Sequence, residues 1–237
     1  MRQTVSQIVV FFALLTIGVS TSATPLADFE ATYKAKFRGF GITAIRKLET
    51  HPDGTQTLSF IADSLLASMS ETSRFRWNNE QHIVPLNYTY KRGGLGRNRT
   101  AHLEFLWDQH KVINNVQDKP WKMTIPDNVL DKLNYQLQIR ADMLSKGTPG
   151  DYEIADGGRL KEYKFEILGD ELVDTPAGKF NATKVKRVRE NEERHTIFWL
   201  AKDWDYLVVR LQQRDDDKSY EIDLHNAMLD GKPVTGL

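Results

Sequence analysis

The stretch Phe29–Arg38, which reads FEATYKAKFR, decides the fold class of this chain. Its apolar residues occupy every second position, and charged or hydroxyl side chains fill the positions between them. This period of two is typical of a β-strand that buries one face and exposes the other to water. The sequence therefore predicts a sheet with one face against a core and one face in solvent.

More segments with strand character follow at intervals of roughly ten residues, which favours an antiparallel meander. Turn-forming residues separate them, such as HPDG at 51–54 and the Gly-rich loop GGLG at 93–96. The predicted strands are 42–48, 55–62, 66–77, 84–91, 100–107, 161–168, 180–189, 195–201, 206–214 and 219–224.

One helix interrupts the strands. It is predicted to open at Pro126-Asp127, where the Asp127 carboxylate would cap the first turn, and to end at Gly147. Its apolar residues recur at helical spacing and form a single stripe, as in an amphipathic helix. They are Leu130, Leu133, Leu137, Ala141 and Leu144.

The composition excludes several classes of protein. The chain has 237 residues, of which 40% are hydrophobic and 27% are charged, as in a soluble globular protein. The 32 basic residues balance the 32 acidic ones, so no charge excess argues for a nucleic-acid partner. The absence of cysteine excludes disulfides, a thiol nucleophile and Cys-ligated metal sites.

The first 23 residues have the pattern of a secretory signal peptide. Arg2 precedes an apolar run from Ile8 to Val19, and small residues then lead to Ala23. The run is shorter than the roughly 20 residues that span a bilayer, so we expect cleavage after Ala23 and no membrane span afterwards. A cysteine-free exported chain of this size is typical of the bacterial periplasm. Residues 24–237 are expected to form a single β-rich periplasmic domain.

Three further stretches carry a family resemblance: LDKLNYQLQIR at 130–140, ELVDTPAGKF at 171–180, and FWLA at 198–201 followed by LVVR at 207–210. Together they resemble the bacterial envelope family called domain of unknown function 3108. The family commonly has a proline before the Val-Arg pair, where this chain has Val208. The resemblance implies a periplasmic, mainly β protein whose single, strongly curved antiparallel sheet, a β-spiral or half-barrel, encloses the helix, similar to the lipoprotein carriers of the Lol system.

No motif for catalysis or for a resident cofactor is apparent. The sequence lacks the GxSxG and SxxK patterns of serine nucleophiles and the HExxH pattern of zinc enzymes. His102, Glu104, Asp108 and His110 would share one face of an uninterrupted strand and would suit zinc. However, the residues from Asp108 onward have the character of a hairpin tip, so we expect four solvated side chains. We predict no catalytic residue, no metal and no cofactor.

The aromatic residues are the remaining functional signal. A curved sheet has a hollow, and the helix is the element available to fill it. If the helix fills it completely, the aromatic residues are core; if it fills it partly, the rest suits an acyl chain or similar ligand. The candidate lining residues are Trp77, Tyr88, Tyr90, Trp199 and the helix residue Leu137. Trp77 and Trp199 are expected at positions that face the interior.

These observations favour a non-catalytic periplasmic envelope protein that supports envelope integrity, with a hydrophobic, acyl or lipid-like ligand or an envelope component as partner. The alternative is a cell-wall glycan-binding protein or hydrolase. For that alternative, the basic side chains Arg97 and Arg99 beside the Gly-rich loop would bind a sugar acid or phosphate group.

Overall fold

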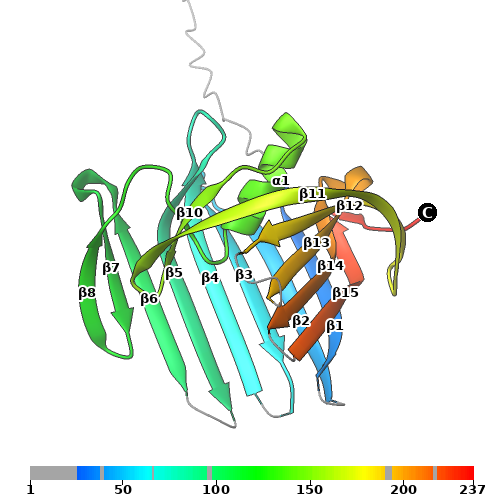
Figure 1. Ribbon diagram of the computed structural model, residues 1–237, viewed down its shortest axis with the longest axis horizontal. Helices are drawn as coiled ribbons and strands as arrows, with labels where there is room; N and C mark the ends of the chain where they lie inside the picture. Colours follow the sequence, from blue (N-terminus) through cyan, green and yellow to red (C-terminus); the bar gives the residue numbers. More distant parts are fainter. Residues whose placement is uncertain (1–25, 38–39, 66, 95–97, 190–193, 216–217) are drawn as a thin grey trace, which may run out of the picture.

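The computed structural model describes residues 26–37, 40–65, 67–94, 98–189, 194–215 and 218–237. The predicted signal peptide at 1–23 and the candidate residue Arg97 lie outside these ranges. Over the described residues, Figure 1 shows one large, strongly curved sheet and one α-helix, α1. The expectation of a mainly β half-barrel is confirmed.

The first half of the chain forms the strands β1 (Phe29–Phe37), β2 (Phe40–Thr50), β3 (Gln56–Asp63), β4 (Ala67–Trp77), β5 (Ile83–Gly94), β6 (Arg99–Leu106), β7 (Lys111–Val116) and β8 (Lys119–Thr124). The second half forms β9 (Leu130–Asp131), α1 (Tyr135–Lys146), β10 (Tyr152–Asp156), β11 (Arg159–Thr175), β12 (Gly178–Val188), β13 (His195–Ala201), β14 (Leu207–Asp215), β15 (Lys218–Leu229) and β16 (Lys232–Pro233). Two 3-10 turns, η1 (Trp107–Gln109) and η2 (Lys202–Trp204), follow β6 and β13.

The strands form one sheet in the order β8-β7-β6-β5-β4-β3-β2-β1-β15-β14-β13-β12-β11-β10-β9, with β16 paired to β15. From β1 to β8 and from β10 to β16 each strand pairs with the next one in the chain, and β1 pairs with β15 to join the two halves of the chain. Nearly every pairing is antiparallel, as predicted; the exception is the short parallel pair of β9 and β10. The core lies between the concave face of this sheet and α1.

The helix begins later than predicted. Leu130 and Asp131 pair with β10 instead of belonging to the helix, and α1 starts at Tyr135. The Asp131 carboxylate accepts hydrogen bonds from the backbone N–H groups of Leu133 and Asn134, which turns the chain just before the helix. Asp127 therefore caps no helix and lies 3.5 Å from His110. The other end is confirmed: Gly147 has a φ of 71° and its N–H bonds to the Met143 carbonyl.

Burial of α1 extends well beyond the predicted apolar stripe. Leu137 is 1% exposed, but Gln138 and Arg140 are also buried, whereas Leu144 is 44% exposed. The long strand β11, which passes in front of the helix in Figure 1, contacts the start of α1, where Tyr135 packs against Tyr163 and Phe165. The Gln138 amide oxygen accepts the backbone N–H of Ile83 at 2.8 Å, and Nε of Arg140 donates to the Asp205 carbonyl at 3.0 Å, whereas both Nη atoms of Arg140 are buried without a hydrogen-bond partner among the described residues. The helix thus occupies one part of the hollow as a nearly fully buried element.

Candidate ligand-binding groove

The helix leaves part of the concave face open. On this face lies a cavity of about 170 Å³, lined mainly by apolar side chains of β1, β2, β3, β4, β14 and β15. Alanines at three of these positions keep the space free. We call this cavity the apolar end of the groove. Its lining residues are Ala35, Ile42, Ala44, Phe60, Ala62, Met69, Leu211, Gln213, Tyr220 and Ile222.

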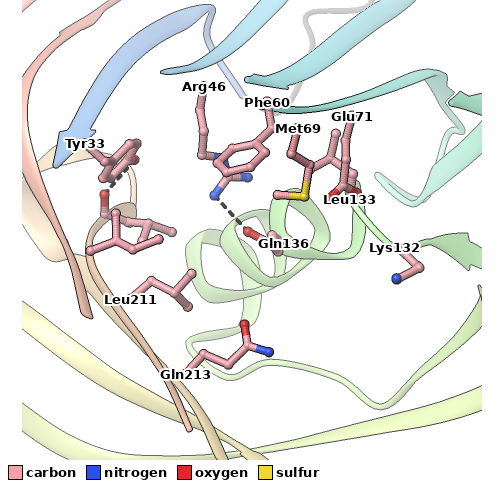
Figure 2. Close-up of a pocket in the computed structure, with 12 residues that line it drawn as sticks. Tyr33, Arg46, Phe60, Met69, Glu71, Lys132, Leu133, Gln136, Leu211 and Gln213 are labelled. Atoms are coloured by element: carbon pink, nitrogen blue, oxygen red, sulfur yellow. Dashed lines mark hydrogen bonds between the residues drawn. The ribbon is translucent and has the colours of Figure 1, made fainter. Parts of the chain in front are cut away.

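A second cavity of about 210 Å³ continues the first toward α1. The two share Phe60, Met69, Leu211, Gln213 and Ile222, and therefore form one groove. In Figure 2, Arg46, Phe60, Met69 and Glu71 of the sheet face two residues on the other side of the cavity. These are Leu133, just before α1, and Gln136, in its first turn. We call Arg46, Glu71, Lys132 and Gln136 the polar end of the groove.

The pairing of β2, β3 and β4 places two charged side chains in one row. Arg46 pairs with Phe60, and Phe60 pairs with Glu71. Since neighbouring strands lie roughly 4.8 Å apart, Arg46 and Glu71 are separated by roughly 10 Å of sheet with the Phe60 ring between them. The register of the sheet therefore keeps these opposite charges from meeting directly.

Arg46 is the unusual group of the groove, because it is 7% exposed. Its Nη1 donates a hydrogen bond of 2.8 Å to Oε1 of Gln136 on the helix. Its Nε is buried and has no hydrogen-bond partner in the part of the chain that the structure describes. Burial of a cation without an opposite charge is expensive, and arginine stays protonated in proteins.

Glu71 is engaged elsewhere. The phenol of Tyr88 donates a hydrogen bond of 2.6 Å to Oε2 of Glu71. Burial raises the pKa of Glu71 despite this hydrogen bond and the positive charges of Lys132 and Arg46. Burial and the adjacent Glu71 carboxylate also raise the pKa of Tyr88. The carboxyl of Glu71 thus bonds to β5, not to Arg46.

The approach to the helix is fixed to the sheet by a buried carboxylate. Oδ2 of Asp131 accepts hydrogen bonds from the hydroxyl of Ser73 on β4 at 2.5 Å and from the amide of Asn134 at 2.8 Å. Burial raises the pKa of Asp131 from 3.8 to about 7, although these hydrogen bonds favour the charged form. This network holds the start of α1 at one side of the groove.

A third cavity of about 360 Å³ adjoins the polar end on the side of β10 and β11 and is lined mainly by polar side chains. Its two lysines share one carboxylate, whereas the buried Nε of Arg187 has no hydrogen-bond partner among the described residues. Lys132 and Lys161 lie 3.4 and 2.5 Å from the Asp156 carboxylate. The guanidinium of Arg187 lies over the Tyr163 ring, 3.1 Å from its centroid. The groove therefore changes from apolar to cationic along its length.

The predicted site residues separate into two groups. Tyr88, Tyr90 and Arg99 come together and line a cavity of about 210 Å³ that shares Met69 and Glu71 with the groove. Trp77 lies at the helix end of the sheet, where its indole N–H donates to Oε1 of Gln56 at 2.7 Å and its ring packs edge-on against Phe75. Trp77 and the buried Leu137 therefore belong to the core.

The interior position expected for Trp199 is wrong. Its neighbour Phe198 packs against Tyr135 of the helix, so Trp199 must point to the opposite face of β13. There it is flanked by its strand partners Lys184 and Arg210, and Lys184 lies 4.9 Å from the ring centroid. The Trp199 side chain is nevertheless buried on that face. Its apolar character therefore could not show which face of β13 it occupies.

Sequence reasoning missed the residues that form the apolar end. Ala35, Ala44 and Ala62 carry small side chains on the concave face of three adjacent strands, β1, β2 and β3. Alanines at alternate strand positions were a usable signal, because a small side chain on a concave face leaves space. Arg46 had no such signal, since a single arginine in a strand is ordinarily exposed.

The histidine segment turns as expected. β6 ends at Leu106, the turn η1 follows, and His110 has a φ of 49°. His102 contacts Thr89 through Nδ1 at 3.1 Å, whereas His110 lies near Asp127. The four candidate zinc ligands therefore do not continue along one strand.

The family motif at 171–180 has a structural role. Its TPAG segment forms the turn between β11 and β12, in which the Thr175 hydroxyl donates to the Gly178 carbonyl at 3.0 Å. Gly178 has a φ of 124°, and a Cβ there would lie 2.8 Å from Cα of Gly236. The turn must carry glycine because the C-terminal segment packs directly on its backbone.

Solved structures with this fold include a β-barrel-like protein of domain of unknown function DUF1849 from Brucella abortus, with a TM-score of 0.57 and 8% identity over 86% of this chain and 98% of that one. A protein described as a lipoprotein from Parabacteroides distasonis aligns over 86% of this chain and 96% of its own, with 13% identity and a TM-score of 0.33. A domain described as an outer membrane lipoprotein-sorting protein from Vibrio parahaemolyticus aligns over 86% and 85%, with 10% identity and a TM-score of 0.22.

No curated protein matches the chain. The described part of the chain contains no helix that is long and apolar enough to cross a membrane. The model of a family of proteins of unknown function, DUF3108, matches residues 28–225, which confirms the resemblance seen in the sequence. The chain is a member of the DUF3108 family.

Proposed function

We propose that this protein is a non-catalytic component of the bacterial periplasm that binds the acyl chain of a lipid-like ligand in the groove. The observation that carries the proposal is the apolar end, a cavity on the concave face of the sheet that α1 leaves open and that continues into the cavity next to Leu133 and Gln136. Apolar cavities with a few polar groups at one side are typical of small-molecule sites. Each methylene group buried there contributes about 0.8 kcal/mol.

The location in the periplasm is supported by the signal-peptide pattern of residues 1–23 and by the absence of cysteine. Cleavage after Ala23 makes Thr24 the first residue of the mature protein. N-terminal sequencing of material from the periplasmic fraction tests this directly. A chain that begins at Met1 would contradict the proposed export.

The binding test is a calorimetric titration of delipidated protein with palmitate. We expect saturable binding to the wild type. Ala62→Phe fills the apolar end and is expected to weaken binding at least tenfold. The matched control is Ile61→Phe, because Ile61 is the neighbouring residue on the opposite face and is 45% exposed. This control should bind palmitate within about twofold of the wild type, which is within ordinary surface effects.

Equal binding by both variants would place the acyl chain elsewhere, and no binding by the wild type would contradict the proposed function. In that second case, sedimentation with insoluble peptidoglycan tests the glycan-binding alternative. Arg99 lies beside Tyr88 and Tyr90 in the adjoining cavity, so Arg99→Ala is the variant that would weaken such binding.

A further inference from the structure

We propose that the ligand is a free fatty acid whose single carboxylate binds the guanidinium of Arg46. This inference rests on the proposed function, because it assigns the head group of the ligand whose chain the groove holds. The expected ligand is therefore an amphiphile with a single negative charge. Its charged group lies at Arg46 and its acyl chain lies in the apolar end.

The first support is the state of the Arg46 side chain. It is 93% buried, it lines the groove, and its Nε is without a hydrogen-bond partner in the described ranges. Its Nη1 donates a hydrogen bond to a neutral amide, that of Gln136. A carboxylate would supply both the missing charge and the missing acceptor, and the planar guanidinium fork matches it with two parallel hydrogen bonds.

The second support is that the other titratable groups of the polar end have partners of their own. Glu71 accepts the Tyr88 hydroxyl and is separated from Arg46 by Phe60. Lys132 lies beside Asp156, and the phenol of Tyr33 donates to the Val208 carbonyl at 2.9 Å. Of the two basic side chains of the polar end, Lys132 has a carboxylate partner and Arg46 has none among the described residues, and a single guanidinium at this place matches a singly charged carboxylate better than a phosphate monoester.

The third support is the direction of the groove. Ala44 and Ile42 lie on the same face of β2 as Arg46, two and four residues before it in the chain, and both line the apolar end. At 3.3 Å per residue, a chain that starts at Arg46 runs roughly 13 Å along β2 before it passes Ile42. Arg46 therefore lies where the head group of an acyl chain in the apolar end would be.

The experiment compares palmitate with hexadecanol, which has the same chain length and no charge. The wild type should bind palmitate at least about tenfold more tightly, which corresponds to about 1.4 kcal/mol. Arg46→Met should abolish this preference by weakening palmitate alone. Lys47→Met is the matched control, because Lys47 is the next residue on β2, faces Glu30 and Glu49 outside the groove and should leave the preference intact.

Gln136→Glu provides an independent test that keeps Arg46 in place. The new carboxylate would pair with the guanidinium and compete with the ligand, so palmitate should weaken while hexadecanol does not. Thermal unfolding of each variant shows that it is folded before its affinity is compared.

The outcomes separate this inference from the proposed function. If neither ligand binds the wild type, the proposed function fails and the assignment of Arg46 fails with it. If both bind equally, the groove holds acyl chains but the carboxylate assignment is overturned. The same assignment is overturned if lysophosphatidate binds more tightly than palmitate, or if Arg46→Met retains the preference for palmitate.

Discussion

The indole of Trp121 on β8 lies so close to Gly158, in the turn between β10 and β11, that a Cβ on Gly158 would lie 1.5 Å from its Cζ2 atom. β8 is one edge of the sheet, whereas β10 lies next to the other edge. The two ends of the strand order therefore come into contact where the Trp121 ring packs on the backbone of Gly158. This contact holds the two ends of the curved sheet together.

Gly158→Ala is expected to destabilise the protein by about 1–3 kcal/mol, because the methyl group collides with Trp121 and the φ of +85° is unfavourable for alanine. Denaturant unfolding measures the change. Gly157→Ala is the control for the backbone effect, since Gly157 has a φ of +57° and open space at its Cβ position. If Trp121→Ala does not relieve part of the cost of Gly158→Ala, the predicted collision is refuted.

Leu137→Ala should destabilise the fold by about 2–5 kcal/mol, because it removes a side chain that is 1% exposed and leaves a cavity against the sheet. Leu144→Ala on the same helix should cost under about 1 kcal/mol, because Leu144 is 44% exposed. Urea titrations of both variants check the difference. Similar costs would show that α1 is not held in the hollow as described.

The stability of the fold should decrease with rising pH between about pH 4 and pH 7 through Asp131. Its pKa is raised from 3.8 to about 7 by burial, so the folded state keeps a proton that the unfolded state has lost. The contribution to stability is thus full at low pH and is lost as the pH passes through the folded-state pKa.

Asp131→Asn should flatten this part of the stability profile, measured by thermal unfolding across that pH window. Ser73→Ala should extend the fall in stability to higher pH, because it removes a hydrogen bond to the carboxylate and raises the pKa of Asp131 further. Identical slopes for the wild type and Asp131→Asn would assign the pH dependence to other groups.

The strands were predictable because their evidence is local. A period of two, as in Phe29–Arg38, is readable in any short window, and Gly147 marks the helix end by its own conformational preference. The helix start was not predictable in this way. Leu130 belongs to β9 because it pairs with Ile154, which lies 24 positions later in the chain.

The groove was not predictable from residue type. Tyr88, Tyr90 and Arg99 share the adjoining cavity, but none of the predicted site residues that the structure describes lines the groove itself. Which face of β13 is concave depends on how the whole sheet curves, so Trp199 was assigned to the wrong side. Arg46 is buried because α1 packs over it. The residues next to Arg46 in the sequence give no sign of this burial.

Photolabelling tests the central claim most directly. A fatty acid with a diazirine at the end of its chain, bound to the delipidated protein and irradiated, should mark the apolar end, and peptide mass spectrometry should find the label on residues such as Ala35, Ile42, Ala62 or Met69. Excess palmitate should suppress this labelling. Labelling confined to the opposite face, for example at Ile61 or Leu172, or labelling that palmitate does not suppress, would contradict the account.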